Sequence, residues 1–171
     1  MFDLKKGQDE EEHIVEKTVT ITQLGTVATT TVTYTWSFTS SDSCNWGSDP
    51  DAPYIWVSND GGPDITYDAK KGDSIANNLL GMNGNSNSGQ RRYFTFTAPA
   101  GGDLTISGKQ RNVGTLTVTL VNGTADLIEG DGVFDSSSIE SATYRLSSGG
   151  TVKFYSDDKC YFSSVSFSYT H

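Results

Sequence analysis

The chain of 171 residues carries 21 acidic and 12 basic side chains, which gives a net charge of −9. Such an acidic protein is a poor match for nucleic-acid phosphates, so we expect no nucleic-acid partner. Serine and threonine contribute 21 residues each, while hydrophobic residues make up 35% of the chain and aromatic residues 11%. This composition favours an all-β extracellular domain over a disordered chain, since threonine suits exposed strand faces and serine suits turns.

Residues 1–30 form an acidic arm or linker with a net charge of −3, from six acids and three lysines. Within this arm, residues 14–24 (IVEKTVTITQL) alternate between apolar and polar, which indicates a strand or a linker that pairs with a sheet edge. The first residues lack the apolar region of a signal peptide, so an exported protein of this sequence is a mature fragment or an excised module. No stretch approaches the roughly 20 apolar residues of a membrane span.

A β-sandwich domain is predicted for residues 31–171. Its first strand is TVTYTWSF, in which Val32, Tyr34, Trp36 and Phe38 lie on one face, so Trp36 is predicted to be a core residue. Residues 39–92 are less regular. They contain two short strand-like segments, PYIWVSN and DITYDA, and one possible helical turn around residues 75–80.

Residues 91–169 read as strand, turn, strand almost throughout. In TLTVTLV, Leu116, Val118 and Leu120 point one way and three threonines point the other. In YFSSVSFSY, strict alternation places Tyr161 on the same face as Val165, which predicts a core-facing ring. Eight or nine such strands in a chain of this length predict an antiparallel two-sheet β-sandwich or jelly roll.

The two cysteines, Cys44 and Cys160, lie far apart and show no zinc-ligand spacing. In an extracellular chain they would form one long-range disulfide between an early loop and the last hairpin. Two separate thiols are the alternative.

Catalytic residues are hard to find in this sequence. The two histidines, His13 and His171, sit in segments where chains fray, so neither suits a general base. The acids lie mostly in turn-like segments, where aspartate is favoured for backbone reasons alone. We therefore expect a protein without enzymatic activity.

Calcium prefers carboxylate and carbonyl oxygens from loops. The turn IEGDGVFD offers Glu129, Asp131 and Asp135 close together, and these are the candidate ligands for a structural calcium ion. The alternative is that they are solvated turn acids, and no acidic loop here matches an EF-hand.

Saccharides stack on exposed aromatic rings, which cover the apolar face of a pyranose. Trp46 lies in a polar loop, which favours exposure, and Tyr54 and Trp56 lie in PYIWVSN. Trp56 alternates with its neighbours in a way that also fits a core residue. Tyr67 and Tyr161 complete the aromatic candidates.

An anionic saccharide would also require lysine or arginine directed at its carboxylates. Lys109 and Arg111, in GKQRN, have the spacing that places two side chains on one side of a strand, and Lys159 is a further candidate. Arg91, Arg92 and Lys153 are weaker candidates. Each of these residues taken alone also fits an ordinary surface charge.

Three segments together resemble a known module: RRYFTFTAPAGGDLTISG, TLTVTLVNG and ATYRLSSGGTVKFYSDDKCYFSSVSFSY. The resemblance is to β-sandwich modules appended to pectate lyases and related secreted polysaccharidases of gut and rumen bacteria, and it covers roughly residues 33–170. It implies a jelly-roll carbohydrate-binding module with an appended catalytic domain in the parent chain, and it implies a structural calcium ion.

Two hypotheses about function follow. In the first, the chain is a non-catalytic extracellular carbohydrate-binding module that targets plant cell-wall polysaccharide, with pectin as one candidate. In the second, it is a surface adhesin or a self-assembling filament subunit. Its arm would then complete the open sheet of a neighbouring copy by strand addition.

Overall fold

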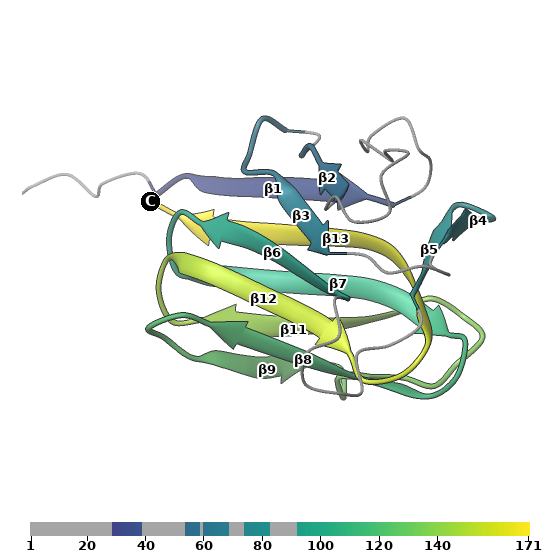
Figure 1. The fold of residues 1–171 in the computed structure, drawn as a ribbon. Coiled ribbons are helices and arrows are strands. Elements are labelled where there is room, and N and C mark those ends of the chain that lie inside the picture. The colour runs from purple at the N-terminus through teal and green to yellow at the C-terminus, as the bar shows by residue number, and fades with distance from the viewer. Residues whose placement is uncertain (1–28, 39–53, 59, 69–73, 83–91) are drawn as a thin grey trace, which may run out of the picture.

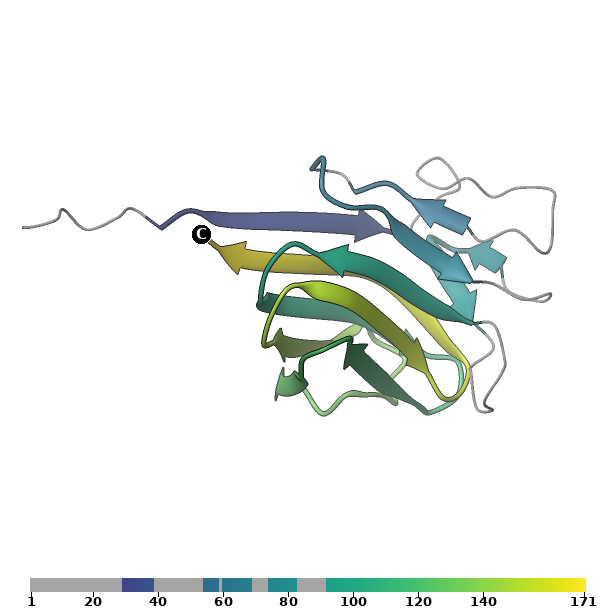
Figure 2. The same cartoon turned by 60° about the vertical axis from the view of Figure 1, so that its left-hand side comes forward.

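The computed structural model describes residues 29–38, 54–58, 60–68, 74–82 and 92–171. Within these ranges every regular element is a strand, and neighbouring strands pair antiparallel. The strands form two sheets that pack face to face (Figures 1 and 2), which confirms the predicted all-β, antiparallel two-sheet sandwich. The predicted strand at 14–24 lies outside the described residues.

The larger layer, which we call sheet A, has seven strands. Six follow the order β4-β5-β13-β7-β11-β9, and β1 pairs with β13 as well. Their bounds are β1 Thr31–Ser37, β4 Ser74–Ala76, β5 Leu79–Met82, β7 Gly102–Gln110, β9 Ala125–Glu129, β11 Glu140–Leu146 and β13 Cys160–Thr170.

The smaller layer, sheet B, has six strands in the order β10-β8-β12-β6-β3-β2. Figure 1 shows its central strands in front of sheet A. The bounds are β2 Tyr54–Trp56, β3 Ile65–Asp68, β6 Tyr93–Ala98, β8 Gly114–Leu120, β10 Val133–Phe134 and β12 Gly150–Ser156.

A bulge divides β13, the long central strand of sheet A. The register between β13 and β7 shifts between Phe162 and Ser164, so Ser163 is an extra residue opposite β7. Before the bulge, β5 pairs with residues 160–162, and after it β1 pairs with residues 164–170. Two strands therefore share one edge of β13.

This bulge reverses the alternation of faces along β13. Cys160 and Phe162 are buried before it, and Val165 and Phe167 are buried after it. Tyr161 therefore lies on the outer face of sheet A and is partly exposed. The prediction that the Tyr161 ring faces the core is wrong, because it assumed unbroken alternation.

Aromatic rings fill the core, and Phe94 of β6 is at their centre. The Phe94 ring stacks on Tyr67 and Phe154, with centroids 4.4 and 4.7 Å away. Phe38 and Phe162 approach it from the β1 and β13 side at 5.2 Å each. Since each buried ring removes on the order of 150–250 Å² from water, this cluster is the main stabilising contact between the sheets.

The edge strand β1 is fastened by the turn that follows β2. Trp36 is fully buried, as predicted, and its indole N–H donates to the Pro63 carbonyl at 3.0 Å. The Asp60 carboxylate accepts from both the backbone N–H and the hydroxyl of Thr35, at 3.0 and 2.6 Å. Asp60 therefore occupies one of the outward-pointing donors on this edge.

The predicted helical turn around residues 75–80 is wrong. The chain instead forms the hairpin β4–β5, with Asn77 and Asn78 as its two turn residues at φ of 53° and 60°. Two consecutive positive φ values define a type I′ turn, which matches the twist of paired strands, and asparagine tolerates this conformation better than most residues.

Candidate functional site

The five predicted aromatic candidates have different outcomes. Tyr67 is fully buried in the core. Trp56 is fully buried, with its ring edge-on to Phe38 at 5.0 Å, so it cannot offer a face to a saccharide. Tyr54 begins β2, but its side chain lies outside the described residues, as does all of Trp46. We therefore build the site from the cations and from Tyr161.

The three predicted cations converge at one end of sheet A. Lys109 of β7 lies directly across from Tyr161 of β13, so both side chains are on the outer face. Just beyond the ends of these strands, the Lys159 carbonyl accepts from the backbone N–H groups of Arg111 and Asn112, at 3.3 and 2.8 Å. The β7–β8 and β12–β13 turns thereby bring the backbones of all three basic residues to the end of sheet A that carries Tyr161.

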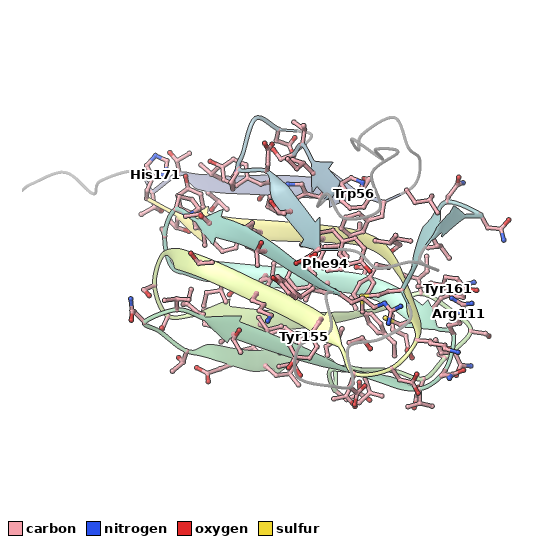
Figure 3. The ribbon with its side chains drawn as sticks, in the orientation of Figure 1. Trp56, Phe94, Arg111, Tyr155, Tyr161 and His171 are labelled. Atoms are coloured by element: carbon pink, nitrogen blue, oxygen red, sulfur yellow. The ribbon has the colours of Figure 1, made fainter. Side chains whose placement is uncertain are left out.

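Tyr161 supplies the ring of this group. The Arg111 guanidinium carbon lies 5.8 Å from the Tyr161 ring centroid, within the range of a cation–π contact (Figure 3). Arg111 and Lys159 are exposed, and Lys109 is partly exposed. We call Lys109, Arg111, Lys159 and Tyr161 the cationic tyrosine site.

Two carboxylates close to this site hold the hairpin and offset part of the positive charge. Asp158 accepts from the Lys159 backbone N–H at 2.6 Å and from the Asn112 amide at 3.5 Å. Asp157 accepts from the Thr115 backbone N–H at 2.6 Å. These bonds hold the turn that carries Lys159, and within the described residues neither Lys109 nor Lys159 has a carboxylate in ion-pair range.

The outer face of sheet A continues from the site as rows of hydroxyl groups. Hydroxyl groups bond across the strands in three pairs, which are Thr33–Ser168 at 2.8 Å, Thr105–Thr143 at 3.0 Å and Ser107–Ser141 at 2.8 Å. At the far end, an open depression of about 450 Å³ lies beside the Asp103–Arg145 ion pair. The face is polar and nearly free of large side chains between these ends.

The predicted calcium ligands each have a local partner. Glu129 accepts from the Thr143 hydroxyl at 3.4 Å, and Asp131 accepts from the Val133 backbone N–H at 2.9 Å. Asp135 is exposed in the same turn. The described part of the chain holds no group of three His, Cys, Asp or Glu side chains arranged around a metal position. Calcium binding by these residues stays a prediction.

Cys160 is a fully buried free thiol, and Cys44 lies outside the described residues. Burial raises the pKa of the Cys160 thiol from its ordinary value of 9.0 to about 12, since a thiolate loses its hydration there, while the Ser156 hydroxyl opposes the rise. This residue is therefore a core side chain and not a nucleophile.

The comparisons with known proteins add no identification. No protein-family model matches the chain, and the search of curated proteins returned no match. In the described ranges, no helix has the length and hydrophobicity to cross a membrane. The fold and the site define the class, which is a β-sandwich with a cationic, tyrosine-bearing end.

Proposed function

We propose that this domain binds polysaccharide without catalysis, through the cationic tyrosine site. The observation that carries the proposal is the Arg111 guanidinium beside the outward-facing ring of Tyr161. Lys109 lies across from that ring, and Lys159 is joined to Arg111 through the backbone. A tyrosine ring covers the apolar face of a pyranose, and the cations pair with sugar carboxylates.

Three cations at one end of sheet A favour an acidic polysaccharide. The whole chain has a net charge of −9, so attraction to a polyanion must come from a local group such as this one. Plant cell-wall pectin is the ligand that fits best. The resemblance to modules of secreted polysaccharidases agrees with this choice and with an extracellular domain that directs an appended enzyme to its substrate.

Affinity electrophoresis and calorimetry with polygalacturonate test the proposal. Retardation of the wild-type protein is expected, and it should weaken as salt is added because the ion pairs are screened. The double change Lys109→Gln with Arg111→Gln removes two charge-assisted contacts of about 1.5–3 kcal/mol each, so binding should fall at least tenfold.

A matched control is Lys153→Gln, which removes the same unit of charge from the other sheet and should bind polygalacturonate like the wild type. Tyr161→Phe should also retain binding, while Tyr161→Ala should weaken it. If no acidic polysaccharide retards the wild-type protein, the proposal is rejected. Retardation by single-stranded DNA alone would replace it with a nucleic-acid function.

A further inference from the structure

The outer face of sheet B carries a second aromatic group. Tyr155 of β12 lies next to Tyr93 of β6, since Phe154 pairs with Phe94 in the adjoining position. The Lys153 ammonium is 4.0 Å from the Tyr93 ring centroid and 5.8 Å from that of Tyr155. All three side chains are partly exposed, and Figure 3 labels Tyr155 on β12, at the front.

Hydroxyl groups surround this tyrosine pair. Thr117 lies across from Tyr155, Thr119 and Thr95 lie on either side of Lys153, and Thr66 lies next to Thr95. Because alternate residues of a strand share a face, all of these side chains belong to the outer surface. Its composition is therefore two rings among threonines.

The charge of this surface differs from that of the cationic tyrosine site. The outward positions of β8, β12, β6 and β3 carry one cation, Lys153, and one acid, Asp68, which lies across from Tyr93. The two charges cancel. Lys153 therefore adds no net positive charge that would favour an acidic ligand here.

We propose that the outer face of sheet B is a second saccharide-binding surface for an uncharged polysaccharide chain. Tyr155 is its stacking ring, and Tyr93, whose ring is covered by the Lys153 ammonium at 4.0 Å, lies beside it. The proposal rests on the polysaccharide-binding function proposed above and adds a second ligand class. The Tyr155 ring covers the apolar face of a sugar, and the threonine hydroxyls exchange hydrogen bonds with sugar hydroxyls.

A protein partner fits this surface less well. The centre of a protein interface is apolar and depleted of small polar side chains. Among the described residues, the exposed large hydrophobic side chains at this surface lie at its margins: Ile55 on the edge strand β2, Val57 directly after it and Val121 directly after β8. A ring pair among hydroxyls therefore matches a saccharide more closely than a protein.

Two binding surfaces on opposite layers make the domain bivalent. The cationic tyrosine site belongs to sheet A, and the Tyr93–Tyr155 pair belongs to sheet B. One domain would then contact acidic and neutral chains together, as a composite cell wall presents them, and the two contacts would add avidity.

Affinity gels that contain xyloglucan, galactomannan or arabinan test the second surface. The wild type should be retarded in at least one neutral gel. Tyr155→Ala should weaken that binding about threefold to tenfold and leave polygalacturonate binding unchanged. Tyr155→Phe keeps the ring and should bind like the wild type, and Tyr161→Ala should show the reverse pattern.

A second measurement follows ligand binding in the wild-type protein. Ring-carbon NMR signals of labelled tyrosines in the wild-type protein, assigned with single Tyr→Phe variants, should shift for Tyr93 and Tyr155 when the neutral ligand is added. The signal of Tyr161 should stay fixed. The second surface is overturned if no neutral polysaccharide retards the wild type, or if Tyr155 is unaffected by a neutral ligand that binds. Loss of polygalacturonate binding alone would reject the first proposal and leave this one standing.

Discussion

Phe94 has more ring partners than any other residue described in the core. It stacks between Tyr67 and Phe154 and also meets Phe38 and Phe162, so one side chain links both sheets. Its exposed fraction is zero. A cavity at this position would leave ring faces on several sides without a partner.

Phe94→Ala is therefore expected to lower the free energy of unfolding by about 3–5 kcal/mol. Urea unfolding followed by tryptophan fluorescence measures the change, since Trp36 and Trp56 are both buried. Ile139→Ala is the control, because Ile139 is 58% exposed and should change stability little. Equal losses in both variants would contradict the central role of Phe94.

Cys160 gives a prediction about pH. Its pKa is raised in the folded state, so the unfolded chain ionises first, near its ordinary value of 9.0. The thiol should leave stability unaffected below that pH, and stability should fall as pH rises from there toward about 12. In a Cys44→Ser background, Cys160 should resist thiol reagents until the protein unfolds. Rapid labelling of the native protein, or a disulfide in the wild type, would contradict the buried free thiol.

At the scale of the element, the β4–β5 hairpin shows why local patterns misled. The segment SIANNLLGM has apolar residues spaced like a helical turn, but its two asparagines adopt the left-handed conformation. Asn78→Ala should therefore destabilise the protein by about 1 kcal/mol, because the alanine Cβ crowds the backbone carbonyl in the left-handed conformation. Asn78→Gly removes the same side chain without that cost, and thermal melts of the two variants should differ. Identical melting temperatures would argue against strain at this turn.

The open edge of β1 bears on the strand-addition hypothesis. Asp60 occupies the outward N–H of Thr35, while Thr31 and Thr33 lie further along the same edge. A carboxylate that occupies a backbone donor of an edge strand hinders pairing with another chain. Strand addition by residues 14–24 stays a prediction of its own.

Size-exclusion chromatography of the full chain and of a chain without residues 1–28 separates the two hypotheses. A carbohydrate-binding domain is expected to elute as a monomer in both forms. A large assembly that disappears on truncation would favour the filament subunit.

At the scale of the whole molecule, the sandwich was predictable because alternation is a property of many residues at once. Trp36, Leu116 and Leu120 all occupy the face that their strand pattern indicates. The site was predictable only in part. Lys109 and Arg111 share a face as their spacing predicts, but nothing in the sequence places Lys159 beside them, since that contact depends on two turns meeting.

Tyr161 was assigned to the wrong face for a specific physical reason. One extra residue, Ser163, reverses the alternation of faces. The overall alternating pattern of the strand does not show where this bulge lies. A signal was present, because Phe162 and Val165 are both apolar and three positions apart, which unbroken alternation forbids on one face. Tyr93 and Tyr155 were likewise brought together by strand pairing and not by proximity in sequence.

The pairing of β1 with β13 determines where a neighbouring domain would attach to the sandwich. Thr30 and His171 exchange backbone hydrogen bonds at 3.0 and 3.1 Å, so the chain enters and leaves the sandwich at one corner. Tyr161 lies near the opposite end of β13. At about 3.3 Å per residue, the strand places Tyr161 roughly 30 Å from that corner (Figure 3). A domain fused at that corner would therefore lie away from a ligand bound at Tyr161.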